Sequence, residues 1–186
     1  KSLSDEINDR KLFFLCEMGL DPGIDHMSAM KIIHQIKVAG GKINSFRSHC
    51  GGLVAPENDN NPWHYKISWN PRNVVLAGKA GAQFLKDGVQ IKLAYHELFN
   101  AQETVQLPGI FPLSFYANRD SLSYIQLYHL EEASNFIRTT LRYPEFIAGW
   151  ADIVALGLTD ELYQYDLAGK SIAAFFWIHF ERLGLG

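Results

Sequence analysis

Residues 12–38 constrain the fold most, because they predict a strand, a turn and a helix in immediate succession. Residues 12–18 form a short apolar run, which is typical of a buried strand. Asp21-Pro22-Gly23 predicts a turn, and Pro22 suits the first position of a helix. Residues 24–38 predict a helix with an apolar residue at every third position: Met27, Met30, Ile33 and Ile36. This unit indicates a fold in which strands and helices alternate.

The rest of the chain continues the alternation. Further strands are predicted at residues 42–50, 65–69, 113–117 and 135–143, and a hairpin at 83–98 around Lys86-Asp87-Gly88. Further helices are predicted at residues 72–82, 145–156 and 168–183, and a short one from Ser121 to about residue 130, with Ser121 as its cap. Residues 2–11 are polar and are expected to be a frayed lead-in. The fold class is therefore α/β or α+β, with helices on one face of a mixed β-sheet and a C-terminal helical segment.

Charge and hydropathy exclude several classes of partner. The 186 residues suit one domain, or one domain with part of a second. The net charge is −3 and the 17 basic residues are scattered, so no electrostatic footprint for nucleic acid or an anionic membrane is expected. The longest apolar run is about half the roughly 20 residues that a spanning helix needs. Two cysteines make no disulfide framework, which favours the cytoplasm.

Several well-known site patterns are absent from the sequence. No glycine-rich dinucleotide fingerprint follows a predicted strand, so this chain alone is not expected to bind a nicotinamide cofactor well. No P-loop or nucleophile elbow is present. His49 and Cys50 are neighbours in a strand and point to opposite faces, and no other metal-ligand spacing occurs, so no metal site is expected.

The first candidate site is the turn at Asp21 and Asp25. Asp21 can be the N-cap of the following helix, which accounts for Asp-Pro without any chemistry. It can equally be a carboxylate at a strand end, facing the crevice where open α/β sheets bind ligands. His26 could transfer protons, but a lone histidine in a first helical turn is more often structural.

The second candidate region follows the predicted strand at 42–50. Cys50 could be a nucleophile or a small buried residue that fills a gap, and the buried, inert case is the commoner one. Gly51-Gly52 allows close approach of the backbone to a ligand or to another strand. The long loop to Pro62 can shape a binding site or be a surface excursion.

Arginines form the third candidate group. Arg138 and Arg142 are four residues apart in a predicted strand, so they share a face with Thr140. Arg119 follows the strand at 113–117. The planar guanidinium suits bidentate carboxylate binding, but pairing with surface acids would explain the same residues. From the residues alone, the prediction is an α/β domain with an anionic-ligand site.

Five motifs resemble one enzyme family. GLDPGIDHM, CGGLVAPE, NPWHYKISW, YANRDS and TTLRY occur in the order, and at spacings, that are similar to the substrate-binding region of saccharopine reductases, the glutamate-forming saccharopine dehydrogenases. The resemblance covers about residues 12–158. It implies a domain similar to the C-terminal domain of glyceraldehyde-3-phosphate dehydrogenase, in an NADP(H)-dependent homodimer that joins glutamate and aminoadipate semialdehyde by reducing their imine to saccharopine.

The resemblance also implies roles and boundaries. Asp21 and Cys50 would lie beside the reacting carbon and secondary amine, and five residues would bind substrate: Lys66, Ser68, Arg119, Thr140 and Arg142. Residues 1–20 would end a cofactor-binding Rossmann domain, 21–158 would form the substrate-binding and dimerisation domain, and 159–186 part of a helical domain.

The chain departs from the family pattern at a few positions. The family usually has Pro at Val54, Tyr at His49, Gly at Thr139, and a smaller pair at Trp63-His64. These differences leave open a relative that acts on another amino-acid imine, of the carboxynorspermidine or homospermidine type. A non-catalytic binding or oligomerisation module on the same scaffold is the alternative from another class.

Overall fold

The structure, a computed structural model, describes residues 3–100 and 103–185. Within this part of the chain a six-stranded sheet has the order β3-β2-β6-β5-β4, with β1 also paired to β6. The strands are β1 (Ser45–Cys50), β2 (Ala82–Lys86), β3 (Val89–Leu93), β4 (Thr104–Val105), β5 (Leu113–Ala117) and β6 (Asn135–Arg142). Because β1 runs parallel to β6 while β2 and β5 run antiparallel to it, the sheet is mixed, as the sequence predicts.

Strand β6 organises the sheet, since it pairs with three neighbours. Its side chains alternate between the two faces, and one face carries Phe136, Arg138, Thr140 and Arg142. We call this the arginine face. Cys50 of β1 and Tyr116 of β5 both lie opposite Thr140 in the register, so they belong to the same face.

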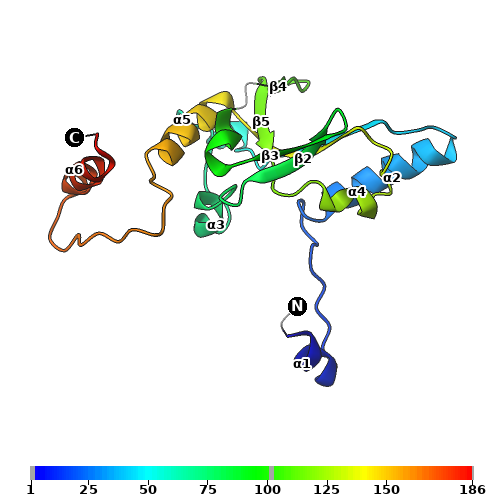
Figure 1. Cartoon of the computed structure of the whole chain (residues 1–186), viewed down its shortest axis with the longest axis horizontal. Helices are drawn as coiled ribbons and strands as arrows, with labels where there is room; N and C mark the ends of the chain where they lie inside the picture. Colours follow the sequence, from blue (N-terminus) through cyan, green and yellow to red (C-terminus); the bar gives the residue numbers. More distant parts are fainter. Residues whose placement is uncertain (1–2, 101–102, 186) are drawn as a thin grey trace.

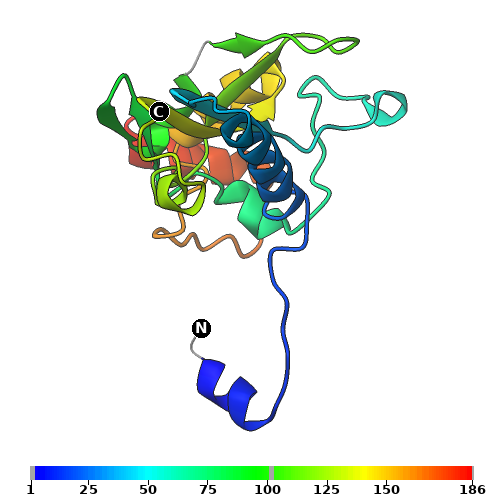
Figure 2. The same ribbon diagram turned by 90° about the vertical axis from the view of Figure 1, so that its right-hand side faces the viewer.

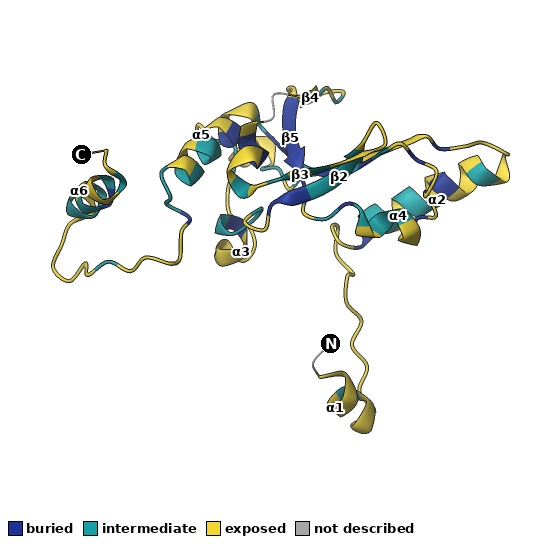
Figure 3. Cartoon of the chain, in the orientation of Figure 1, coloured by how far each residue is buried: buried dark blue, intermediate teal, exposed yellow. Residues whose placement is uncertain are grey.

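Helices α2 (Ile24–Val38) and α4 (Ser123–Leu127) cover one end of the arginine face (Figure 1). Ile33 of α2 and Tyr128, which follows α4, share a hydrophobic core with Phe136 of the sheet. The helix at 24–38 is confirmed, but not all of the apolar side chains predicted to face the core are buried. Ile33 is 3% exposed whereas Met27 is 60% exposed, and in Figure 3 most of α2 has the colours of intermediate and exposed residues.

A second core encloses the end of β5. Phe146 and Ile147 of α5 (Pro144–Ala155) pack with Leu98 and Phe99 of the 3₁₀ segment η2 (Tyr95–Asn100) and with Tyr116. The remaining short elements are η1 (Pro56–Asn58) and α3 (Pro71–Val75). Beside these two cores, Arg138, Thr140 and Arg142 of the arginine face line a pocket.

Several sequence-based assignments are wrong. Residues 12–18 are extended but form no strand, because no strand among the described residues pairs with them, and Phe13 is 83% exposed. Residues 65–69 form a loop rather than a strand. The helix predicted at 72–82 ends at Val75, since Gly78 and Gly81 have φ of 85° and 74°, and Ala82 begins β2. In place of a frayed lead-in, helix α1 (Ser4–Asp9) stands away from the sheet on the extended segment (Figures 1 and 2).

The C-terminal helix α6 (Ile172–Leu183) starts later than predicted, where the Ser171 hydroxyl accepts a hydrogen bond from the N–H of Ala174. His179 is 2% exposed and joins α6 to the end of α5. Its Nε2 lies 2.5 Å from the Leu156 carbonyl oxygen, and its Nδ1 lies 2.6 Å from the hydroxyl of Tyr165. No helix in the described part of the chain is long and apolar enough to cross a membrane.

Candidate functional site

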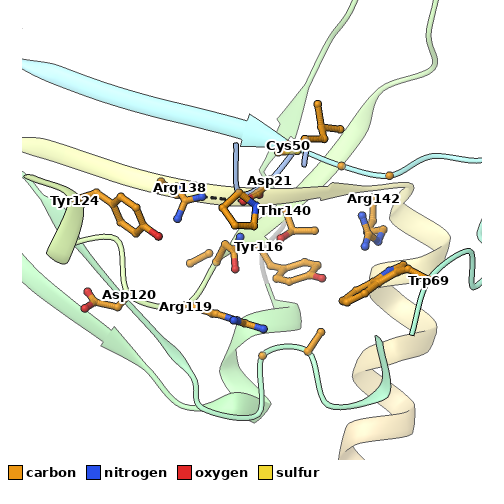
Figure 4. A pocket seen from close by; sticks show the side chains of 18 of the residues that line it. Asp21, Cys50, Trp69, Tyr116, Arg119, Asp120, Tyr124, Arg138, Thr140 and Arg142 are labelled. Atoms are coloured by element: carbon orange, nitrogen blue, oxygen red, sulfur yellow. Dashed lines mark hydrogen bonds and ion pairs between the residues drawn. The ribbon is translucent and has the colours of Figure 1, made fainter. Parts of the chain in front are cut away.

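A pocket of about 680 Å³ opens on the arginine face, beyond the C-terminal end of β1 (Figure 4). Its walls come from β1, β5 and β6, from the loop after β5, and from two segments far apart in sequence around residues 20–22 and 65–69. The polar and aromatic residues that line it include Asp21, Cys50, Tyr65, Ser68, Trp69, Tyr116, Arg119, Tyr124, Arg138, Thr140 and Arg142.

At one end of the pocket, the lining residues Asp21 and Arg138 form a charged triad with Asp25, which is not itself a lining residue. One terminal nitrogen of Arg138 lies 2.9 Å from Oδ1 of Asp21 and 2.9 Å from Oδ2 of Asp25. The guanidinium also stacks on the Tyr124 ring, 4.2 Å from its centroid. Burial alone would lower the pKa of Arg138, but Asp21 and Asp25 raise it instead. We call these three charged residues the acidic triad.

Asp21 does not cap α2, because the N-cap residue is Gly23 and no side chain of the described residues makes a capping hydrogen bond there. Of the two interpretations of Asp21, the capping one is therefore wrong. The Gly23 N–H donates to Asp25 Oδ1 at 2.8 Å. Burial would raise the pKa of Asp25, but hydrogen bonds from Gly23, His26 and Arg138 hold it below the ordinary value. Pro22 is not in the first helical position either, because Gly23 follows it as the N-cap residue at φ 149°. The Asp21-Pro22 peptide bond is cis.

Cys50 lies at the pocket end of β1, beside the acidic triad. Burial and then the negative charges of Asp21 and Asp25 raise the pKa of its thiol. A thiol with a raised pKa is protonated at neutral pH and is a poor nucleophile. The nucleophile interpretation is therefore disfavoured, and Cys50 is suited instead to donate a weak hydrogen bond toward Asp21.

Gly51 explains how β1 can end so close to β6. A Cβ atom on Gly51 would lie 2.6 Å from the Leu141 carbonyl oxygen and 2.8 Å from the Leu141 Cβ. A Cβ on Gly52 would meet nothing within 4 Å. The sequence allows the glycine pair to approach either a ligand or another strand closely. Gly51 approaches another strand, β6.

The opposite end of the pocket is positive and aromatic. Arg142 is 8% exposed and stacks on the Tyr65 ring, 4.7 Å from its centroid. Its guanidinium donates a hydrogen bond to the Leu141 carbonyl oxygen, and no carboxylate within residues 3–100 and 103–185 forms an ion pair with it. Its Nε is buried without a partner among the same residues. A buried guanidinium in this state has donors that can bind an anion.

The wall between the two ends is formed by Tyr116 and Thr140, which pair across β5 and β6. Burial raises the pKa of Tyr116, although Arg142 and the side chain of Thr140 act in the other direction. Tyr116 therefore keeps its hydroxyl proton at neutral pH and offers both a donor and an acceptor near the middle of the pocket.

Arg119 reaches the pocket from the loop that follows β5. Its φ is 47°, a left-handed conformation that is uncommon for arginine. The Arg119 carbonyl accepts a hydrogen bond from the N–H of Gln83 at 2.9 Å, which fixes the loop to β2. Strained backbone of this kind is often found at functional sites.

The next residues in this loop correct a predicted cap. Asp120, not Ser121, caps α4, because its Oδ1 accepts from the N–H groups of Leu122 and Ser123. The hydroxyl of Ser121 instead accepts a hydrogen bond from the backbone N–H of Arg138 at 2.9 Å. This contact fixes β6 at the residue that carries the acidic triad's guanidinium.

The structure brings together most of the predicted site residues. Six of the seven line the pocket: Asp21, Cys50, Ser68, Arg119, Thr140 and Arg142. Lys66 is exposed and is not among the lining residues, since the loop at 65–69 turns Tyr65, Ser68 and Trp69 to the pocket instead. The roles assigned to all seven residues remain predictions.

Two histidines have structural contacts. His26 Nδ1 lies 2.5 Å from the Tyr128 hydroxyl, and its ring stacks on Tyr124. His49 Nδ1 lies 2.6 Å from the Thr139 hydroxyl, directly opposite it in the β1–β6 register and on the face away from the arginines. Two of the departures from the family pattern, His49 and Thr139, are therefore one contacting pair outside the pocket.

Sequence reasoning did not connect Asp25 with Arg138. It also did not identify the aromatic residues that line the pocket, which are Tyr65, Trp69, Tyr116 and Tyr124. The contacts of Arg138 with Asp21 and Asp25 span 117 and 113 residues of sequence, and no local pattern encodes them. The four-residue spacing from Arg142 placed Arg138 in the predicted arginine group, but it gave no sign of the two carboxylates. In the described part of the chain, no group of three or more His, Cys, Asp or Glu residues could hold a metal ion.

The fold and the pocket define a mixed α+β domain that presents a polar, charge-separated ligand site on one face of its sheet. The chain belongs to the saccharopine dehydrogenase C-terminal domain family, whose model matches residues 19–184. The resemblance found in the five motifs is thereby confirmed at the level of the family.

Named relatives agree with this assignment. The chain is 45% identical to a saccharopine dehydrogenase [NADP(+), L-glutamate-forming] of Pyricularia oryzae over 81% of its length, and 40% identical to an alpha-aminoadipic semialdehyde synthase of Arabidopsis thaliana over 91%. The solved structure of apo saccharopine dehydrogenase (L-Glu forming) from Saccharomyces cerevisiae matches 80% of the chain with a TM-score of 0.72 at 40% identity. The chain spans 34%, 16% and 33% of these three proteins.

Proposed function

We propose that this chain is the substrate-binding domain of an NADP(H)-dependent, glutamate-forming saccharopine dehydrogenase of lysine metabolism. The full-length protein would interconvert saccharopine with 2-aminoadipate 6-semialdehyde and glutamate. The family assignment and the names of the relatives support this reaction. The pocket supports the chemical class of the substrate.

The observation that carries the proposal is the buried, unpaired guanidinium of Arg142. Saccharopine has three carboxylates, a secondary amine and a primary amine, so its binding site needs several cationic donors. Arg142 and Arg119 both line the pocket, and neither forms an ion pair with a carboxylate of residues 3–100 or 103–185. A substrate carboxylate on Arg142 would supply the bidentate partner that a buried guanidinium otherwise lacks.

The acidic triad supports the placement of the substrate nitrogen. Its two carboxylates and single guanidinium leave one net negative charge at the end of the pocket opposite Arg142. A protonated secondary amine would compensate that charge, while the Cys50 thiol and the Asp21 carboxylate lie beside it. Positioning and charge stabilisation by these groups would supply most of the domain's share of the rate enhancement.

The residues of this chain do not by themselves suit the dinucleotide. The only tandem glycine pair that follows a strand, in residues 3–100 and 103–185, is Gly51-Gly52 after β1. It leads into a loop and then into η1 rather than into the N-terminus of an α-helix. A pyrophosphate cradle needs that helix N-terminus. We therefore assign the binding of NADP(H), which supplies the hydride, to another part of the full-length protein.

The full-length protein tests the proposal. With aminoadipate semialdehyde, glutamate and NADPH, we expect NADPH oxidation and the formation of saccharopine, which mass spectrometry can identify. Parallel assays use the amine–aldehyde pairs of carboxynorspermidine and homospermidine formation. Turnover of one of those pairs, with none of the first, would show that the substrate assignment is wrong.

We also propose a homodimer, as the family resemblance implies. It is supported by a second concave surface, of about 590 Å³, on the sheet face opposite the arginines, where Phe84, Phe115 and Ile137 are lining residues. The lining also includes charged residues, among them Arg47 and Glu103, and a concave sheet face of this mixed kind is a suitable interface for another copy of the chain. Sedimentation equilibrium of the full-length protein tests this, and a monomer at micromolar concentration would contradict it.

A further inference from the structure

The two arginines of the arginine face differ in what they bind. Arg142 has no carboxylate partner in the described residues, whereas one nitrogen of Arg138 contacts Asp21 and Asp25 together. The Arg138 guanidinium is also stacked on Tyr124, as Figure 4 shows. Arg138 is therefore already neutralised within the protein and is not available to bind a substrate carboxylate in the way that Arg142 is.

The backbone that carries Arg138 is fixed on both sides. Its N–H donates to the Ser121 hydroxyl at 2.9 Å, and its carbonyl accepts from the N–H of Asn118 at 2.8 Å. With the main chain and the ring stack both fixed, the guanidinium has little freedom to follow a moving carboxylate. It acts as a fixed point to which the carboxylates are held.

The two carboxylates of the acidic triad are not equivalent. Asp25 is 7% exposed, and its two oxygens are occupied by Gly23 N–H and Arg138. Asp21 is 22% exposed, and only its Oδ1 contacts Arg138. Asp25 therefore helps to hold the Arg138 guanidinium in place, while the Oδ2 atom of Asp21 is available to a ligand in the pocket.

We propose that Arg138 is a positioning residue that orients the Asp21 carboxylate toward the substrate's reacting nitrogen. This inference rests on the proposed function. Arg138 holds one oxygen of Asp21 so that the other faces the nitrogen, and Asp25 holds Arg138. Arg142 binds a substrate carboxylate at the other end of the pocket. The two arginines thus have separate effects, one on the chemical step and the other on substrate affinity.

The test compares kcat and KM in variants of the full-length protein. Arg138→Met alone leaves two carboxylates close together without a cation and could fail to fold. The main variant is therefore Arg138→Met combined with Asp25→Asn, which keeps the net charge of the triad at minus one. Its kcat is compared with that of Asp25→Asn alone, so that the loss of the Asp25 charge is common to both.

We expect kcat of the double variant to fall on the order of 100-fold relative to Asp25→Asn, because misplacement of a reacting group by about 1 Å has effects of this size. KM for glutamate should change less than about threefold. Arg138→Lys keeps a cation near both carboxylates, so its kcat should be at least about tenfold higher than that of the double variant. If the role of Arg138 were purely structural, Arg138→Lys would not restore kcat, and kcat and KM would change together rather than kcat alone.

Two further arms separate the possible failures. Arg72→Met removes an exposed arginine of α3, and its kcat and KM should match the wild type. If the wild-type protein does not turn over the proposed substrates, the proposed function fails, and this inference fails with it. If the wild type is active and the folded double variant keeps the kcat of Asp25→Asn, the positioning role of Arg138 is refuted while the proposed function stands.

Discussion

Arg138 and Arg142 lie four residues apart on the same strand face and are both buried, yet their electrostatic states are opposite. Arg138 is compensated within the chain, and Arg142 is not. Under the proposed function, a bound carboxylate offsets the part of the desolvation cost of Arg142 that its contacts with Tyr65, Phe146 and the Leu141 carbonyl do not offset. At this position, affinity for a carboxylate and stability of the empty protein are therefore opposed.

We predict that Arg142→Met raises KM for glutamate on the order of 10- to 100-fold, the range for loss of a hydrogen bond to a charged group. Methionine retains the apolar contacts with Tyr65 and Phe146. The melting temperature of the empty variant should equal or exceed that of the wild type, because an unpaired buried charge has been removed. Steady-state kinetics and calorimetry measure both effects. An unchanged KM, or a large loss of stability, would contradict the carboxylate-binding role.

Cys50 gives a prediction about pH. Burial and the charges of Asp21 and Asp25 raise the pKa of its thiol, so the thiolate forms only at a pH above the ~8.5 of an ordinary free cysteine. Alkylation of Cys50 should therefore begin at higher pH than that of a free thiol, and Asp21→Asn should shift the onset downward. The background is Cys16→Ser, because Cys16 is exposed. Rapid labelling of Cys50 at neutral pH would instead indicate an activated nucleophile.

At the scale of elements, the contact between β1 and β6 determines where the pocket begins. The parallel register places Cys50 beside Thr140, and the chain then passes Leu141 at Gly51. This passage requires that residue 51 has no side chain. The neighbouring Gly52 is not under the same constraint.

We predict that Gly51→Ala destabilises the fold by about 1–3 kcal/mol, because its Cβ would overlap backbone atoms of Leu141. The matched control is Gly52→Ala, whose Cβ meets open space. This control should leave the free energy of unfolding unchanged or raise it by up to about 1 kcal/mol. Urea denaturation of the two variants measures the difference. Equal stability would show that β1 can move away from β6 at little cost.

Local patterns predicted some of these elements well and others poorly. The strand at 113–117 and the helix at 24–38 match the structure, because their residue types and bounding residues specify them locally. Residues 12–18 have the composition of a strand but lack a partner strand in the described chain, and a strand requires one. The sequence left Asp21 open between a helix cap and a ligand-facing carboxylate, because its distant partner, Arg138, could not be inferred from neighbouring residues.

The candidate site was predictable to the extent that it follows family motifs. Asp21, Cys50 and Arg142 lie in quoted motifs, and all three line the pocket. Lys66 lies in a motif too, but the loop geometry turns it away from the pocket. Asp25 also lies in a motif, yet its part in the acidic triad depends on a tertiary contact 113 residues away.

At the scale of the whole molecule, the extended segment before the acidic triad is an exposed apolar surface. Leu12, Phe13, Phe14 and Leu15 are 52%, 83%, 65% and 63% exposed, and no strand of the described residues pairs with them. The chain spans about a third of its relatives among the saccharopine dehydrogenases. The division at residue 20, with residues 1–20 belonging to a separate cofactor-binding domain, is a prediction that this exposed segment supports.

This division predicts that residues 12–15 become a buried strand in the full-length protein. Their backbone N–H groups should exchange with solvent slowly there, because strand pairing protects them, and rapidly in the isolated chain. Hydrogen exchange with mass spectrometry compares the two proteins, with residues 113–117 of β5 as the internal control that is protected in both. Equally rapid exchange of residues 12–15 in both proteins would show that they belong to a linker. The domain boundary would then lie before residue 12 rather than at residue 20.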